Sequence, residues 1–174
     1  MKKLIIYILI TAVLFALGTF GAHAQDVSDA SASLRSEVQE SGFDYRAENL
    51  REFLEIYDSP LAIYAEDFVT YADLNGLDYR LVPSISGVES TFGKHIPTDS
   101  FNAYGWANGE YGFTSWENSI AVVSQTLKIS YIDRGAPTIA KIAKRYAPPS
   151  VTWAGKVKFF VKKIDSLPLN FDII

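Results

Sequence analysis

Apolar residues recur at three- and four-residue intervals through most of the chain, as expected for amphipathic helices that pack around one core. A first short stripe runs from Leu50 to Tyr57. Ser59 is then a suitable N-cap, and Pro60 suits the first position of a helix because its missing N–H is not needed there. Asn75-Gly76 is typical of a helix end. The pattern therefore predicts a helix from Pro60 to about Asn75.

Four further helices are indicated by the same combination of caps and stripes. Pro83 is expected to begin one, and Thr114-x-x-Glu117 has the pattern of a capping box that opens another. Pro137 is expected to begin a short helix that Pro148-Pro149 must end, and Ser150 to cap the last. The fold class predicted is mainly α, a compact bundle of about six helices.

One segment, AYGWANGEYGFT at 103–114, departs from the helical pattern. Its Asn108-Gly109 pair is typical of the type I′ turn of a two-residue hairpin. Pairing around that turn would bring four aromatic side chains to one face, because alternate residues of a strand share a side. These are Tyr104, Trp106, Tyr111 and Phe113. We therefore predict a small β-hairpin with an aromatic face, which makes the fold an α+β variant of the mainly α class.

The N-terminus has the parts of an export signal. Lys2 and Lys3 supply positive charge, residues 4–22 carry none, and Ala22-His23-Ala24 is a small-x-small cleavage pattern. We predict a signal peptide at 1–24; an uncleaved membrane anchor is the alternative, because the apolar run is close to spanning length. Either way the folded part is expected to be exported: extracellular, periplasmic or associated with the cell wall.

The rest of the chain divides into three parts. Residues 25–43 are small and polar, which predicts a flexible linker. A single domain is expected over 44–168, large enough to bury a core without disulfides, and 169–174 form a tail.

The composition excludes several classes of site. The chain has no cysteine and, after the export signal, a single histidine, His95, so a metal centre rich in Cys and His is excluded. A Ser-His-Asp triad would have to use His95. The formal net charge is −4 and no basic patch interleaved with aromatic residues is expected, so a nucleic acid is not expected as the partner. No metal or organic cofactor is implied, and we expect a monomer.

Glu89 is the first candidate for chemistry. On a helical projection it lies between Ile85 and Val82, inside the apolar arc and near the C-terminus of its helix. A carboxyl group there is expected to be desolvated and close to the negative end of the helix dipole, and both effects favour the protonated form that a general acid needs. A Glu that reaches solvent, or that pairs with Arg80 or Lys94, is the alternative.

The string GVESTFGKHIPTDSFNAYGW at 87–106 contains Glu89-Ser90, then Gly93, then Asn102-Ala103-Tyr104-Gly105. This order resembles the catalytic stretch of the lysozyme-like superfamily, which includes lytic transglycosylases, goose-type lysozymes and bacterial endo-β-N-acetylglucosaminidases. Phe113–Trp116 at the start of a helix, and Tyr146 followed by Ala-Pro-Pro, resemble most closely the mannosyl-glycoprotein endo-β-N-acetylglucosaminidase branch, or glucosaminidase domain. The resemblance covers roughly residues 50–165.

The resemblance implies a lysozyme-like fold and a glycosidase that cleaves β-1,4 linkages of peptidoglycan or a related amino-sugar polymer. Glu89 would be the proton donor to the glycosidic oxygen. Trp106 and Tyr111 are the expected stacking platform for sugar rings, although core packing is the alternative for the aromatic cluster. The full set expected to support the acid or to contact substrate is Ser90, Asn102, Tyr104, Gly105, Trp106, Tyr111 and Tyr146.

Glycosidases commonly use two carboxyl groups, and the second is open in this sequence. Glu117 is better explained by the capping box, Glu110 by an exposed turn and Asp99 by a turn cap. A single-acid mechanism, in which the N-acetyl or hydroxyl group of the substrate takes the second role, is therefore an option, with either hydrolysis or lytic transglycosylation as the result. The alternative function is a non-catalytic cell-wall glycan-binding protein or an envelope interaction module.

Overall fold

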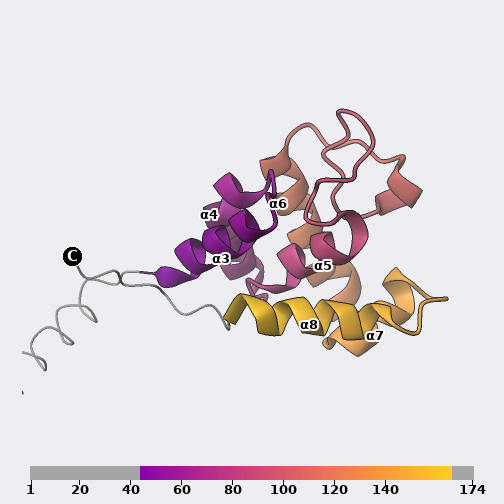
Figure 1. Cartoon of the computed structure of the whole chain (residues 1–174). Helices are drawn as coiled ribbons and strands as arrows, with labels where there is room; N and C mark the ends of the chain where they lie inside the picture. Colours follow the sequence, from indigo (N-terminus) through magenta and orange to yellow (C-terminus); the bar gives the residue numbers. More distant parts are fainter. Residues whose placement is uncertain (1–43, 166–174) are drawn as a thin grey trace, which may run out of the picture. The chain divides into compact units, whose positions relative to one another are not determined.

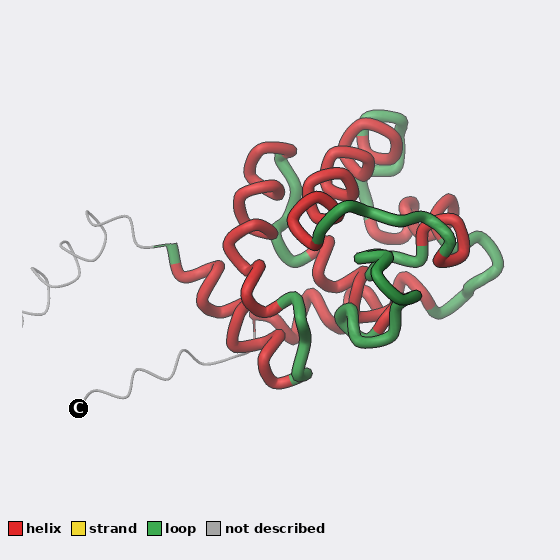
Figure 2. The backbone as a smooth tube through the Cα atoms, turned by 90° about the horizontal axis from the view of Figure 1, so that it is seen from above, coloured by secondary structure: helices red, strands yellow, loops and turns green. Residues whose placement is uncertain are grey.

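The computed structural model describes residues 44–165, and the helical pattern of the sequence is realised there as six α-helices (Figure 1). They are α3 (Tyr45–Ile56), α4 (Ala65–Asn75), α5 (Leu81–Ser90), α6 (Trp116–Thr126), α7 (Ile139–Tyr146) and α8 (Trp153–Asp165). Two 3-10 turns, η1 (Ala62–Tyr64) and η2 (Trp106–Gly109), and a π-helical turn, η3 (Leu127–Ile132), complete the elements. No strand occurs within 44–165 (Figure 2), so the mainly α class is confirmed for this range.

The predicted signal peptide, linker and tail lie outside the described residues. Within 44–165, no helix combines the length and the hydrophobicity needed to cross a bilayer.

Several helix ends form where the local sequence predicts them. Gly76 ends α4 with a φ of 61°, the left-handed conformation that glycine adopts without a steric cost. The Ser150 hydroxyl accepts a hydrogen bond from the Trp153 backbone N–H at 3.1 Å and so caps α8. The helix expected after Pro137 is α7, which begins with Thr138 as its N-cap. These ends are set by single side chains close in sequence.

Two helix starts differ from the prediction. α4 begins at Ala65 rather than at Pro60, because the Ser59 hydroxyl donates to the carbonyl of Phe92 and accepts from the N–H of Leu61, which turns the chain into η1 first. α5 begins at Leu81, two residues before Pro83. A proline is tolerated there because the N–H groups of the first turn have no partner inside the helix.

The capping box of α6 also differs from the prediction. Ser115, not Thr114, is the N-cap, and its hydroxyl accepts from the N–H of Asn118. The Asn118 side-chain oxygen in turn accepts from the N–H of Thr114. The N-cap bond is thus made one residue later, the return bond goes to Thr114 rather than to the N-cap residue, and Glu117 is left without a capping role.

The predicted β-hairpin at 103–114 is not formed. Its Asn108-Gly109 turn is present, with Glu110 N donating to Ala107 O at 3.1 Å. However, Ala107 also has a positive φ, so three consecutive left-handed residues coil the chain into η2. A strand needs extended backbone directly beside the turn, and Ala107 does not supply it.

The Asn102 side chain makes hydrogen bonds in place of the backbone bonds that would join the two strands of a hairpin. Its side-chain amide donates to the carbonyls of Trp106 and Tyr111, at 2.8 and 3.0 Å, and thereby ties the two sides of the loop together. Phe113 donates its N–H to Ser100 at 2.8 Å instead of across a hairpin. The four aromatic side chains predicted to share a face do lie together, with neighbouring ring centroids 4.8–6.3 Å apart.

The core surrounds α5, whose residues 81–86 are all buried. The helix packs on α8, as Figure 1 shows, and its C-terminal end reaches the loop that contains Asn102. The large, fully buried side chains come from every α-helix or its flanks and include Leu50, Phe53, Phe68, Ile85, Phe92, Ile120, Ile142 and Ile164. A buried helix held from several sides gives its last turn a defined position, and that turn carries Glu89.

Candidate active site

Glu89 lies in the last turn of α5, and its side chain is exposed. The prediction that it is desolvated within the apolar arc is therefore wrong. The arc itself is buried, as Val82 and Ile85 show, but α5 ends one residue later at Ser90 and leaves Glu89 at the surface. Its position depends on the element packed beside it.

That element is α8, whose first residue holds the carboxyl group. The indole Nε1 of Trp153 donates to Oε1 of Glu89 at 2.6 Å. Trp153 is buried, and its ring stacks on Tyr146 with centroids 5.1 Å apart. Trp153 was not among the site residues expected from the sequence. The available signal was the indole N–H, since a buried tryptophan almost always needs an acceptor.

The second carboxylate oxygen of Glu89 faces the backbone of Gly105. A Cβ at position 105 would lie 2.8 Å from Oε2, and Gly105 has a φ of +70°. The short distance and the left-handed backbone each favour glycine at this position. The Asn102–Gly105 segment therefore contacts Glu89 through its main chain, because a side chain at position 105 would be too close to the carboxyl group.

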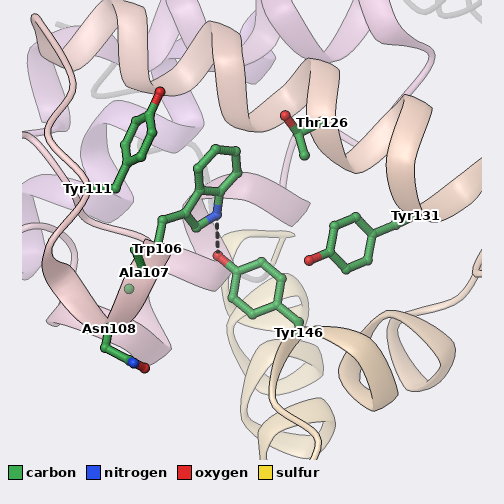
Figure 3. A pocket seen from close by; sticks show the side chains of 8 residues that line it. Trp106, Ala107, Asn108, Tyr111, Thr126, Tyr131 and Tyr146 are labelled. Atoms are coloured by element: carbon green, nitrogen blue, oxygen red, sulfur yellow. Dashed lines mark hydrogen bonds between the residues drawn. The ribbon is translucent and has the colours of Figure 1, made fainter.

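Tyr146 joins this segment to the aromatic cluster. Its hydroxyl donates to the carbonyl of Tyr104 at 2.7 Å and accepts from the indole N–H of Trp106 at 3.1 Å, the bond drawn in Figure 3. Burial raises the pKa of Tyr146 well above its ordinary value of 10, and the negative charge of Glu89 raises it further. The hydroxyl is therefore neutral at physiological pH and is engaged in fixing the loop.

Three residues predicted to contact substrate are buried instead. Ser90, Asn102 and Tyr104 have 4%, 2% and 0% of their surface exposed. The Ser90 hydroxyl donates to the carbonyl of Ala103 at 2.8 Å and so attaches the end of α5 to the loop. These side chains build the walls of the site and have no surface from which to touch a sugar.

An open cavity of about 400 Å³ lies beside this loop (Figure 3). Gly105 lines this cavity and also lies against Glu89, so it is the residue that links the cavity to the carboxyl group. Two of its residues, Thr126 and Tyr131, come from the end of α6 and from η3, and sequence reasoning did not select them. The lining comprises Gly105, Trp106, Ala107, Asn108, Tyr111, Thr126, Tyr131 and Tyr146.

The candidate second carboxyl groups are not among the residues that line the cavity. Glu117 is directed at α4, where its charge raises the pKa of Tyr71 and contributes to the raised pKa of Asp67. Asp99 and Glu110 are exposed in the loop between α5 and α6. Among residues 44–165, no three His, Cys, Asp or Glu side chains come together as a metal site would need. Glu89 does not line the cavity itself and is connected to it through Gly105.

The sequence matches no protein-family model, and comparison with characterised proteins returns no match. Function is therefore argued from the site itself. The arrangement is a carboxyl group held by one hydrogen bond, a glycine backbone beside its other oxygen, and an aromatic-walled cavity next to both. These are parts suited to donating a proton to a ligand with broad, partly apolar faces.

Proposed function

We propose that the chain is a glycosidase of lysozyme or glucosaminidase type that cleaves β-1,4 bonds between the amino sugars of peptidoglycan or a related polymer. Glu89 is the proton donor in this proposal. The observation that carries it is the Trp153–Glu89 hydrogen bond, because it holds a carboxyl group against Gly105, a residue that also lines the aromatic cavity. The ordered likeness of 87–106 to lysozyme-like enzymes supports the same residue.

The two oxygens of Glu89 have different roles. An indole N–H is a donor only, so Oε1, which accepts it, carries no proton in that direction. Oε2 lies beside Gly105, a residue of the cavity wall, and is the oxygen from which the proton would be transferred. Protonation of the glycosidic oxygen from Oε2 lets the leaving sugar depart as an alcohol, which is the work of a general acid.

The aromatic wall accounts for binding. The faces of a pyranose ring carry apolar C–H groups that stack on aromatic side chains. Tyr111 has 46% of its surface exposed, and Trp106 beside it is held in orientation by the hydroxyl of Tyr146. A sugar that stacks on this pair lies next to Gly105, and so next to Glu89.

The second role of a glycosidase falls to the substrate in this proposal. Within 44–165 none of the candidate second carboxyl groups lines the cavity, so the N-acetyl group or a hydroxyl of the sugar would stabilise the developing positive charge. Attack by water then gives hydrolysis, and attack by a sugar hydroxyl gives an anhydro end. Both outcomes use the same proton donor.

Mass spectrometry of the fragments released from purified peptidoglycan tests the proposal. The wild-type chain is expected to release muropeptides, and Glu89→Gln to lower that rate about 10²- to 10⁴-fold, as loss of a general acid does. Glu117→Gln is the matched control and is expected to keep near wild-type activity. A folded Glu89→Gln protein with undiminished activity would overturn the assignment. A wild-type chain that binds peptidoglycan without cutting it would be the glycan-binding protein of the alternative.

A peptidoglycan substrate requires the domain to lie outside the cytoplasm, and we propose that residues 1–24 direct its export. N-terminal sequencing of the exported protein is expected to begin at Gln25. A start at Met1 in the membrane fraction would instead identify an anchor.

A further inference from the structure

Charge is distributed unevenly along the domain. Residues 44–133 contain 14 acidic and five basic side chains, whereas residues 134–164 contain eight basic side chains and no acidic one. The net charge of −4 conceals this division. The basic stretch forms α7 and α8, which lie side by side at the lower edge of Figure 1. Its exposed basic residues are Arg134, Lys141, Lys144, Arg145, Lys156, Lys158, Lys162 and Lys163.

The outer face of α8 combines charge with an exposed aromatic ring. At 100° per residue Phe159 lies near the middle of the exposed arc, with Lys156 and Lys163 on one side and Lys158 and Lys162 on the other. Phe159 has 53% of its surface exposed, and the Lys163 ammonium lies 5.8 Å from the centre of its ring. In residues 44–165, no carboxylate forms a salt bridge with Lys156, Lys158 or Lys162.

An apolar groove adjoins this ring. A cavity of about 710 Å³ runs between the end of α5 and α8, with Val88 on one side and Phe159 and Phe160 on the other. Gly155 is part of the groove, and a side chain there would meet no atom within 4 Å. Val151, two residues before α8, is 97% exposed. The face therefore presents apolar surface and positive charge together.

We propose that the outer face of α8 docks the domain onto a lipid bilayer that contains anionic headgroups. A soluble polyanion would satisfy the lysines and leave Phe159 and the groove in water. A bilayer offers both components, because lysine ammonium groups reach the headgroups while their apolar stems and the aromatic ring enter the interface. Phe159 lies on a different face of α8 from Trp153, roughly 120° around the helix, although the groove extends to Val88 and Thr152 beside the candidate active site.

A fluorescent probe in the groove tests this docking directly. The chain contains no cysteine, so Gly155→Cys in the full chain accepts one environment-sensitive dye and keeps Phe159. Leu74→Cys is the matched control, because Leu74 is 73% exposed on α4 of the acidic part. With vesicles of pure phosphatidylglycerol the dye at 155 is expected to shift to the blue and the dye at 74 is not. Vesicles of pure phosphatidylcholine are expected to shift neither.

The lysines provide the second arm of the test. A Lys158→Gln, Lys162→Gln double substitution is expected to weaken the response to phosphatidylglycerol roughly tenfold or more, because each basic residue near an anionic surface contributes about 1 kcal/mol. Added salt is expected to weaken it in the same way. Both residues are exposed, so the fold has no need of their charge.

Four results would overturn the proposal. The first is an absence of any shift at 155, and the second is an equal shift at 74, which would mean that the chain reaches the vesicle without using this face. The third is the same response from soluble polyphosphate, which would identify a polyanion site. The last is a dye at 155 already shielded before lipid is added, which would show that another part of the chain or a second copy covers the groove. Both labelled proteins carry the same N-terminal apolar run, so any effect of that run on vesicle binding is the same for the two dye positions.

Discussion

The two faces of α8 are built from different kinds of side chain. The inner face presents one polar group, the indole N–H of Trp153, to one acceptor at 2.6 Å, and the indole is buried and stacked on Tyr146. The outer face presents four lysines around one ring, each on a long, exposed side chain. The first arrangement is suited to placing a carboxyl group for chemistry, and the second to an extended surface that has no single geometry. The same helix serves both because its two faces are built from different kinds of side chain.

The largest effect is expected from removing the indole N–H on the inner face. Trp153→Phe keeps an aromatic ring against Tyr146 but deletes the donor to Glu89. The rate of peptidoglycan cleavage is expected to fall roughly 10- to 100-fold, because a misplaced catalytic group loses much of its advantage. Lys158→Gln on the outer face is the control, with an unchanged rate on soluble glycan fragments. Equal rates in the two variants would remove the distinction between the faces.

Gly105→Ala is expected to act on the same carboxyl group from the opposite side. The added Cβ would lie 2.8 Å from Oε2 of Glu89, so the side chain must move. We expect a roughly tenfold loss of rate, with a loss of stability of about 1 kcal/mol from the left-handed backbone. Kinetics and thermal unfolding separate the two effects. Gly135→Ala provides a comparison, because Gly135 is also left-handed but open, and it is expected to lose stability without losing rate.

Tyr146→Phe tests how far the loop depends on a single hydroxyl group. The substitution leaves the ring stacked on Trp153 and removes the donor to the carbonyl of Tyr104. An unpaired buried acceptor costs about 1–3 kcal/mol, so unfolding by denaturant is expected at lower concentration. The fluorescence of Trp106, which loses its acceptor, is expected to change as well. Unchanged stability would mean that water replaces the hydroxyl.

The smallest effect concerns the acidic part of the domain. Burial raises the pKa of Asp67 above 3.8, and the charges of Glu117 and Glu66 raise it further. A raised folded-state pKa means that the contribution of Asp67 to stability is present in acid and is lost as the pH rises through that pKa. Asp67→Asn is therefore expected to stabilise the domain at neutral pH by less than about 1 kcal/mol. The gain is expected to disappear below pH 3.8, as unfolding measured at both pH values would show.

Local sequence predicted the helices more accurately than the loop. Gly76 and Ser150 act on backbone groups within a few residues, so their effect is visible in the sequence. The loop at 103–114 depends on the Asn102 amide, which binds two carbonyls that a hairpin would have used otherwise. An Asn-Gly pair is compatible both with a β-hairpin and with a turn held by side-chain hydrogen bonds. Which of the two forms depends on whether the loop carbonyls bind the opposite strand or the Asn102 amide.

The candidate site was predicted in part. Trp106, Tyr111 and Tyr146 do line one cavity. Trp153 was missed because its spacing fits a packing face equally well, and the charge of α8 was missed because the net charge averages over the chain. A count of charge by segment would have found the second feature.

The sequence by itself determined which segments form helices, where most of them end, and that four aromatic side chains gather in one loop. These features depend on backbone conformation and on contacts between residues close in sequence, so short segments of the sequence are enough to predict them. Only the tertiary structure decided that Glu89 is exposed and that Trp153, 64 residues away, holds it. Helical periodicity states which residues share a face but not where the helix stops relative to its neighbours. The packing of α5 on α8 fixes where α5 ends relative to α8, and so fixes the position of the Glu89 carboxyl group.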